Sequence, residues 1–473
     1  MDKKECIELL KKSKLIVGSL STSQPIKFGK TKSGKAIYQI KALKTIFPPF
    51  WITYGGRLEG KILIAFKFKE WKEEDKLPFA EIVEVLGLYD EKLLSKVLLY
   101  HYEIDRKNFK NNMTNSNEKN IVRKDLRKLF IFSIDPKGSI DIDDALSIDK
   151  IDNRVIVGVH IAQPICWLNK EEIIERSNTA FSTLYLEDKN KNLWSDEITM
   201  NASLFQDQDK PAYSIFFSFE DNKIINIESY PTLIKNKLNT NYDQIDFKQI
   251  NELLEFTNVL NKRTLDSHEL VSHWMIEANK YIGNNFDNIP YRVQSNNNNN
   301  NFNEIANNQI KSIFQNMLLE GATYSYDKIF HKTLDVNKYT HFTSPIRRMI
   351  DTINHWNITY SNDPIVLDLD ILNKIDYKTK KFHRQMNLIA KINILPDEKD
   401  TEGWLYNKSE NKWNVYFEEL GFMKVKIWDK KLEYLKEINS NDYHIGKSYE
   451  FKIIKKVGFL PHQKILIILK TKQ

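Results

Sequence analysis

Cysteine is scarce in this sequence, with only Cys6 and Cys166 among 473 residues. Two thiols cannot form a disulfide framework, and alone they cannot complete a zinc site. Long apolar runs are also absent, because Ile62–Phe68 and Ile465–Leu469 are short and bordered by lysines, whereas a membrane helix needs about 18 apolar residues. The first 14 residues mix both charges without an apolar stretch, unlike a secretory signal. We therefore expect a soluble, cytoplasmic chain with no membrane partner.

The composition excludes simple disorder, because 41% of the residues are hydrophobic and can build cores. A length of 473 residues suggests about three domains of roughly 150 residues each. The formal charge of +7 is modest, but lysines alternate with aromatic residues in 66–72, 424–431 and 451–456. Such mixing suits a groove that binds phosphates and stacks bases. It suits a strand with one solvated face equally well, so the pattern leaves both interpretations open.

Turn residues divide the chain into three regions. Short apolar runs between glycines over 14–88 predict a small β-barrel, and the polar stretch 105–120 predicts a linker. Strands and helices mix from residue 130, and strands return after residue 401. The asparagine run 296–301 indicates a loop insertion. The clearest expected strands are 36–43, 50–54, 62–68, 155–162, 413–417, 424–428, 449–454 and 465–469, and the clearest expected helices are 91–102, 269–281, 311–326, 344–356 and 377–394.

Four carboxylates gather within ten residues: Asp135, Asp141, Asp143 and Asp144. Like charges this close raise one another's pKa, so a fold that gathers them needs a compensating cation. Hard divalent ions supply it, and Mg²⁺ commonly binds a few carboxylates together with water and substrate phosphates. A solvated acidic loop is the alternative, but apolar residues such as Ile142 interleave with the aspartates and anchor the turn in a core. We therefore predict a metal site.

Other acidic motifs fail at single positions. A calcium-binding loop needs an oxygen ligand where Ala145 stands, and a later glycine that is missing here. Ala145 also breaks the aspartyl-phosphate motif, and Ser147 replaces the last carboxylate of an Asp-Asp-x-x-Asp motif.

A second informative segment is Tyr339–Asp351. We expect a helix that begins with Ser344 as N-cap and Pro345 in its first turn. A helix N-terminus favours phosphate, and Arg347 and Arg348 so close to it call for an anionic partner. An arginine pair bound to acidic neighbours is the alternative.

A carboxylate cluster and an arginine-bearing phosphate site together indicate metal-dependent phosphodiester hydrolysis. The metal activates water and offsets charge on the leaving oxygen, while arginine stabilises the transition state. Hydrolysis is favoured over transfer because the sequence has no glycine-rich nucleotide loop.

Three segments in this order, 134–145, Val157–Ala162 and Tyr339–Arg348, resemble those of the RNase II and RNase R exoribonucleases and the catalytic subunit of the eukaryotic exosome. The resemblance implies an α+β fold, in which an RNB-type mixed α/β catalytic domain is flanked by small OB-fold β-barrels. The implied domains are a cold-shock-like OB-fold RNA-binding domain with a helical linker, the RNB catalytic domain and a C-terminal OB-fold RNA-binding domain, over 1–118, 119–400 and 401–473.

The resemblance further implies a processive 3′-to-5′ exoribonuclease that hydrolyses single-stranded RNA to nucleoside 5′-monophosphates with a Mg²⁺-activated water, or with Mn²⁺ in its place. The implied partner is single-stranded RNA, and we expect a monomer. All four aspartates match metal-binding and catalytic positions of the family, and Asp143 is expected to matter most for cleavage. Arg347 matches the arginine that stabilises the phosphate in the transition state.

Further residues match positions that bind RNA. Tyr185 matches the tyrosine that stacks on the terminal base, and Tyr242 matches a tyrosine near the sugar. Within the arginine motif, the expected RNA-binding residues are His341, Thr343, Ser344 and Arg348.

The sequence departs from the family pattern at several positions. Gln163 and Pro164 follow Ala162 where the family has Asp-Val, Ser272-His273-Trp274 stand where glutamates are common, and Gln294 stands where a histidine is frequent. The insert that often carries a second stacking aromatic is shortened to Arg263–His268. These departures concern the sugar and terminal-base contacts. They leave a DNA nuclease as one alternative function. Another is an RNA-binding member of the fold with weak or no catalysis, although the four retained aspartates and Arg347 argue against it.

Overall fold

The computed structural model describes residues 2–23, 28–31, 33–104, 107–110, 121–186, 189–294, 305, 307–317, 321–409, 412–426 and 443–470. These residues divide into two compact units. Unit 1 comprises residues 1–105, 300–315 and 378–473, and unit 2 comprises residues 106–299 and 316–377. The three-domain division stays a prediction.

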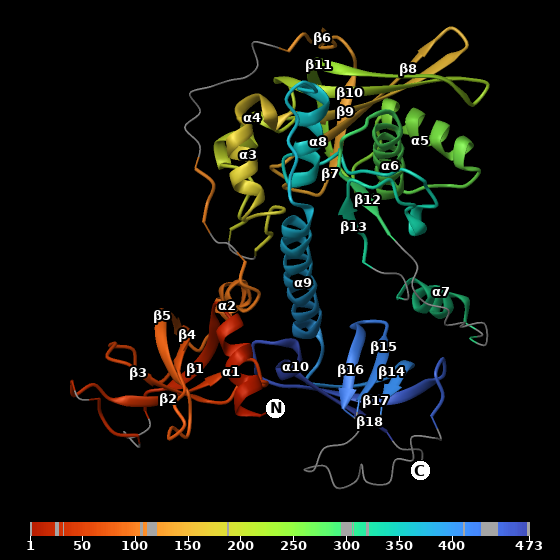
Figure 1. Ribbon diagram of the computed structural model, residues 1–473. Helices are drawn as coiled ribbons and strands as arrows, with labels where there is room; N and C mark the ends of the chain where they lie inside the picture. Colours follow the sequence, from red (N-terminus) through yellow and green to blue (C-terminus); the bar gives the residue numbers. More distant parts are fainter. Residues whose placement is uncertain are drawn as a thin grey trace. The chain divides into compact units, whose positions relative to one another are not determined.

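A curled mixed sheet is the centre of unit 2 (Figure 1). Its strands run in the order β10-β9-β8-β7-β11-β6, and β11 also pairs with β10, so that five strands form a closed ring of pairings. β7 and β6 pair parallel with β11, and the other pairs are antiparallel. The bounds are β6 Lys124–Asp125, β7 Ile131–Asp135, β8 Asp144–Ile151, β9 Arg154–Ala162, β10 Asp209–Glu220 and β11 Lys223–Asn241.

Helices α5 Lys248–Asn261 and α6 Ser267–Asn285 lie against this sheet (Figure 1). Their buried residues, such as Leu253 and Trp274, join Phe217 and Val159 of the strands in one apolar core. Burial of such side chains gives most of the favourable free energy of folding. The remaining elements of unit 2 are η3 Pro164–Trp167, α3 Lys170–Ser177, α4 Asp196–Ala202, β12 Tyr291–Val293, β13 Thr323–Ser325, η4 Lys332–Leu334 and α8 Met349–Thr359, followed by α9 Leu369–Ile394, which continues into unit 1.

The helix expected to begin at Ser344 begins instead at Met349, and this prediction was wrong. Residues 345–347 form a turn, after which Arg348 is extended and pairs with Ser182. The N–H of Met349 donates to the carbonyl of Phe181 at 2.8 Å, and that of Thr183 donates to the carbonyl of Arg347 at 3.0 Å. These tertiary bonds replace the helical ones, so Ser344 is not a helix N-cap.

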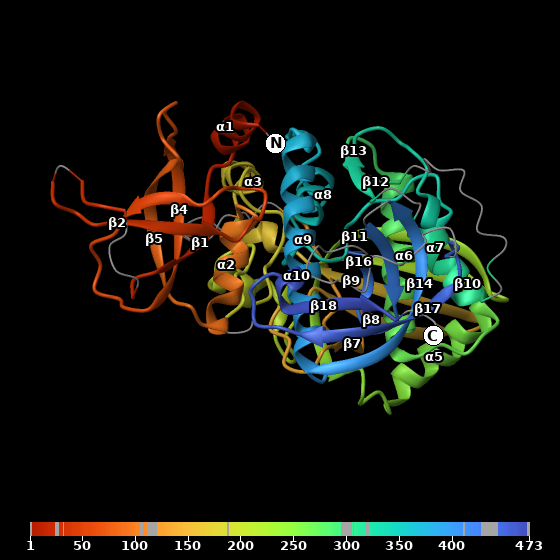
Figure 2. The ribbon, with the colours of Figure 1, turned by 90° about the horizontal axis from the view of Figure 1, so that it is seen from below.

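Unit 1 contains a closed five-stranded barrel in the order β1-β2-β3-β5-β4, as the sequence predicts for 14–88. In Figure 2, α1 and α2 lie beside this barrel, and Cys6 and Leu10 of α1 enter its core. The bounds are α1 Lys3–Lys12, β1 Ile16–Ser21, β2 Ile37–Ala42, β3 Phe50–Thr53, β4 Lys61–Glu70, β5 Phe79–Leu88, η1 Glu91–Leu93 and α2 Leu94–His101.

A second sheet of unit 1 has the order β16-β15-β14-β17-β18. Its bounds are β14 Glu398–Ser409, β15 Lys412–Phe417, β16 Gly421–Lys426, β17 Ser448–Lys455 and β18 Ile465–Leu469, with α10 Pro461–Lys464 before the last strand. Phe314 of α7 Asn308–Met317 contacts Tyr406 and Phe422 of this sheet.

The helix expected over 311–326 is shorter than predicted, because Thr323–Ser325 pairs with β12 as a strand.

Some sequence predictions fall outside the described residues, among them the asparagine run 296–301 and most of the linker 105–120. α9 starts at Leu369, eight residues before the expected start at Tyr377. None of the helices within the described residues has the length and apolar character that crossing a membrane requires.

A buried histidine in the sheet of unit 2 makes stability depend on pH. The imidazole of His160 lies between the hydroxyls of Ser147 and Ser214, at 3.0 and 2.7 Å, and burial lowers its pKa to about 3. Below pH 6.5 this imidazole is protonated in the unfolded chain but stays neutral in the folded chain. The free energy of unfolding therefore decreases as the pH falls below 6.5.

The free energy of unfolding should decrease between pH 7 and pH 4.5 in both proteins. We expect this decrease to be smaller in His160→Gln than in the wild type by about 2–3 kcal/mol. Urea denaturation at the two pH values measures this difference. The exposed His444 gives a matched control, because His444→Gln should keep the wild-type pH dependence. An unchanged pH dependence in His160→Gln would contradict the assignment.

Candidate active site

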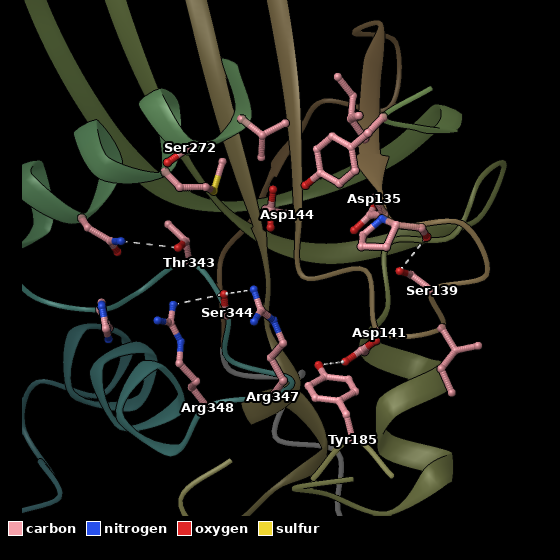
Figure 3. Close-up of a pocket in the computed structure, with 18 of the residues that line it drawn as sticks. Asp135, Ser139, Asp141, Asp144, Tyr185, Ser272, Thr343, Ser344, Arg347 and Arg348 are labelled. Atoms are coloured by element: carbon pink, nitrogen blue, oxygen red, sulfur yellow. Dashed lines mark hydrogen bonds between the residues drawn. The ribbon is translucent and has the colours of Figure 1, made fainter. Parts of the chain in front are cut away.

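A pocket of about 710 Å³ in unit 2 gathers both motifs that the sequence singled out. Figure 3 shows Asp135 and Asp144 on one side and Arg347 and Arg348 on the other. Its remaining walls come from the β7–β8 loop, from one face of α6 that includes Ser272 and Met275, and from Tyr185, Tyr242, His341, Thr343 and Ser344. The structure therefore brings ten of the eleven predicted site residues to the pocket lining, and Asp143 lies just behind it.

A shared apolar cluster holds the two motifs together. Ile142 and Ile346 are both buried in one cluster with Ile131 and Ala145. Each of these isoleucines directly precedes a predicted catalytic residue, Asp143 or Arg347. Packing of the two apolar neighbours therefore sets the aspartate beside the arginine, which confirms that the acidic turn is anchored in a core.

Asp143 is buried, at 2% exposure, and faces Arg347. Its Oδ2 accepts from Nε of Arg347 at 3.0 Å, and its Oδ1 accepts from the N–H of Ile346 at 2.7 Å. Burial raises the pKa of Asp143, against the lowering effects of Arg347 and the Ile346 N–H. One carboxylate oxygen therefore fixes the backbone just before Arg347, and the other fixes Nε of its guanidinium group.

Asp135 and Asp144 form the acidic wall of the pocket, at the end of β7 and the start of β8. Burial, and after it the charge of Asp144, raises the pKa of Asp135 to about 7. Burial also raises the pKa of Asp144 to about 6, against the lowering effect of Arg347. Oδ2 of Asp135 is buried without a hydrogen-bond partner among the described residues. A buried acceptor beside a second carboxylate is the arrangement that a cation stabilises.

Asp141 contacts a predicted base-stacking residue. Its Oδ2 accepts from the hydroxyl of Tyr185 at 2.9 Å (Figure 3). Burial, and then the charge of Asp141, raises the pKa of Tyr185, so the phenol stays protonated. The bond fixes one end of the ring, and the Tyr185 side chain as a whole is 44% exposed.

Ser344 joins the two arginines. Its Oγ accepts from Nη2 of Arg347 at 3.0 Å and from Nη2 of Arg348 at 3.1 Å (Figure 3). Asp351 is completely buried and pairs with Arg348 at 3.0 Å, and its Oδ1 also accepts from the N–H of Ser344 at 2.8 Å. Arg348 therefore has the acidic neighbour that the alternative interpretation required, and Arg347 has another in Asp143.

The structure adds residues that the sequence did not indicate. Asn279 of α6 donates to Tyr339 at 3.1 Å and to Thr343 at 3.5 Å, and Tyr324 bonds Nδ1 of His341 at 2.6 Å. Only Asp351 had a local signal, because it lies three residues after Arg348 within one helical turn. The other partners are distant in sequence, so no spacing could reveal them.

The residues fit a divalent ion in part. Within the described part of the chain, no three His, Cys, Asp or Glu side chains lie close enough to hold a metal ion together. Asp135 and Asp144 have raised pKa values and face the same pocket. Mg²⁺ is commonly bound through one or two carboxylates, with water and substrate phosphate completing the shell. These two aspartates therefore fit Mg²⁺ in the presence of a phosphate ligand.

The RNB domain model matches residues 123–249 and 245–360, which together span just over half of the chain. The chain belongs to the RNB family. Both the predicted relationship and the predicted α+β fold class are confirmed. The matched residues include every predicted site residue, from Asp135 to Arg348.

Curated relatives match with low identity. The chain is 26% identical to Ribonuclease R of Chlamydia pneumoniae over 319 residues, covering 49% of this chain and 47% of the relative. It is 27% identical to human Exosome complex exonuclease RRP44 over 241 residues, covering 45% of this chain and 25% of the relative. The matches thus span about half, or less, of these relatives.

Solved structures show the same fold. The apo form of Mycoplasma genitalium RNase R superposes with a TM-score of 0.77 at 20% identity, covering 96% of this chain and 89% of that one. Yeast Ssd1, described as a pseudonuclease, superposes with a TM-score of 0.69 at 13% identity, covering 98% and 84%. Nucleases and a pseudonuclease therefore share this RNB architecture.

Proposed function

We propose that this RNB protein is a 3′-to-5′ exoribonuclease that hydrolyses single-stranded RNA to nucleoside 5′-monophosphates. The observation that carries the proposal is the pocket in which Asp135 and Asp144 face Arg347 and Arg348. Carboxylates alone would repel RNA, and arginines alone would only bind it. Together with a divalent ion they suit the cleavage of a phosphodiester.

The acidic wall supplies the place for the metal. Asp135 and Asp144 would hold Mg²⁺, or Mn²⁺, with Asp141 at the edge of the pocket. When bound, such an ion generates a hydroxide nucleophile at neutral pH and offsets charge on the phosphate. The role of the protein here is to hold two partly buried carboxylates on the same wall of the pocket.

The basic wall supplies the phosphate contacts. Guanidinium groups carry five N–H donors in a fixed fork, and Arg347 uses Nε for Asp143 and Nη2 for Ser344. The guanidinium orientation is fixed before substrate arrives, which is the condition for strong transition-state stabilisation. Arg348, His341, Thr343 and Ser344 are proposed to bind the adjacent phosphate and sugar groups.

Two tyrosines suit the bases and sugars. The Tyr185 ring is exposed beside Asp141, and Tyr242 is half-buried beside Asp135 and Asp144. Stacking on aromatic rings tolerates any base. We propose that Tyr185 stacks on the terminal base and that Tyr242 contacts its sugar, with the 3′ end of the strand inserted.

Incubation of the chain with 5′-labelled single-stranded RNA and Mg²⁺ tests the proposal. Release of nucleoside 5′-monophosphates with stepwise shortening is expected, and a matched DNA oligomer should be degraded more slowly. RNA binding without any nucleotide release would instead support the catalytically inactive alternative, with which the shared fold of the pseudonuclease Ssd1 is consistent.

Removal of the metal should abolish turnover. We expect EDTA to lower nucleotide release by at least about 10³-fold, and added Mg²⁺ to restore it, because the ion held by Asp135 and Asp144 would activate the attacking water. Mg²⁺ should also raise the melting temperature, since it relieves repulsion between Asp135 and Asp144. Asp135→Asn should lose this thermal shift, whereas the exposed Asp149→Asn should keep it. Turnover that persists in EDTA would contradict the metal site.

A further inference from the structure

An aromatic pair lies beside the catalytic pocket. The ring of Tyr242 stacks on the imidazole of His268, with ring centres 3.6 Å apart and planes inclined by 15°. Tyr242 follows the last residue of β11, and His268 is the second residue of α6. The two residues are distant in sequence, and the fold alone brings them together.

The backbone around this pair is fixed at several points. Asp266 and Glu269 form a capping box at the start of α6, and Arg263 pairs with Glu269 at 2.7 Å. Oγ of Ser267 donates to the carbonyl of Tyr242 at 3.0 Å. The start of α6 is therefore tied directly to the chain segment that carries the tyrosine, so the rings meet in a defined geometry.

The two rings differ in what they face. His268 is exposed to solvent, whereas Tyr242 is half-buried and lines the pocket. Burial, and then the charges of Asp144 and Asp135, raises the pKa of Tyr242 to about 12. Its hydroxyl therefore stays protonated, and it lies within the electrostatic influence of both carboxylates of the acidic wall. The imidazole covers one face of its ring.

The imidazole of His268 is already solvated because it is exposed, so it gains little from the parallel stack at 3.6 Å. The stack therefore acts mainly on Tyr242. A half-buried tyrosine ring at a pocket edge has more than one staggered rotamer available. A stacked neighbour selects one of them, because the face-to-face contact with the imidazole is lost when the tyrosine ring turns away.

We propose that His268 is a positioning residue, which holds the Tyr242 ring in the pocket wall so that its hydroxyl meets the ribose-phosphate of the terminal RNA nucleotide. This inference rests on the proposed function and adds a residue outside the pocket lining to it. His268 acts only through Tyr242. A flat ring at position 268 should therefore suffice, whether or not it can carry a proton.

Equilibrium binding of a short single-stranded RNA in EDTA tests the proposal without requiring turnover. We expect His268→Ala to weaken binding by about 3- to 10-fold, the size of one aromatic pair. His268→Phe should restore binding to within about twofold of the wild type, because it keeps the stack. In Mg²⁺, His268→Ala should raise KM by a similar factor and leave kcat nearly unchanged.

Two controls separate the outcomes. Asp149→Asn changes an exposed residue of β8 in unit 2 that is not among the predicted site residues, and it should bind RNA like the wild type. The melting temperatures of both His268 variants should match that of the wild type, because the imidazole is exposed.

Equal RNA affinity of His268→Ala and the wild type would overturn the positioning role, and so would a Phe variant as weak as the Ala variant. A wild-type chain that binds RNA but releases no nucleotide would overturn the proposed catalysis instead, and the binding comparison would still decide the role of His268.

Discussion

Asp143→Asn is expected to lower the rate of nucleotide release by at least about 10³-fold, while RNA affinity changes by less than about threefold. The carboxylate uses one oxygen for the N–H of Ile346 and the other for Nε of Arg347. An asparagine can accept from only one of these donors, and its own NH₂ group would face the other. The fold is kept by the Ile346 bond, but the guanidinium loses its fixed orientation.

Single-turnover kinetics and RNA binding in EDTA measure the two halves of this prediction. Asp149→Asn is the matched control, because Asp149 lies on β8, the strand that follows Asp143, and is exposed. Its Oδ1 accepts from the N–H of Lys150, a bond that asparagine can reproduce. Wild-type turnover in Asp143→Asn would show that the buried aspartate is structural. A large loss of RNA affinity would assign it to binding.

Arg347→Lys is expected to lower kcat by about 10²- to 10³-fold with little change in thermal stability, because the substitution keeps the charge but loses the fork. A lysine ammonium cannot bond Asp143 and Ser344 with separate nitrogens, as Nε and Nη2 of the arginine do. It therefore cannot present further N–H groups to a phosphate from a fixed plane.

The matched control is Arg154→Lys, an exposed arginine at the far end of β9 whose contact with Glu220 is long, at 3.9 Å. The double variant Asp143→Asn/Arg347→Lys should lose about as much turnover as the more severe single variant, because the two residues act as one unit. Full additivity of the two losses would contradict the coupling that the structure shows.

Short-range chemistry explains which predictions from the sequence succeeded. The strands around Val157 and Ile62 were foreseeable, because continuous apolar runs between turns indicate buried strands. The aspartate cluster stood out because its four members lie within ten residues. Spacing this close predicts a bound cation, but it does not predict which of the four carboxylates bind that cation.

The start of α8 shows where local reasoning fails. Ser344 and Pro345 form a good helix-start signal, yet the helix begins at Met349 because Arg347 and Met349 pair with the segment around Phe181. Those bonds come from residues more than 160 positions away. No window of sequence contains them, so a tertiary interaction overrode a sound local preference.

The sequence alone indicated that this chain folds as an RNB protein, and it singled out Asp135–Asp144 and the arginine motif as the candidate site. Only the tertiary structure decided which of these side chains pair with one another and which face the pocket. Asp143 is turned inward to hold Arg347, Asp135 and Asp144 are left to face the pocket, and Tyr242 is stacked on His268. The reason is physical: residue type and spacing fix which charges are available, but burial and long-range packing fix which of them are paired with one another and which are left for the substrate.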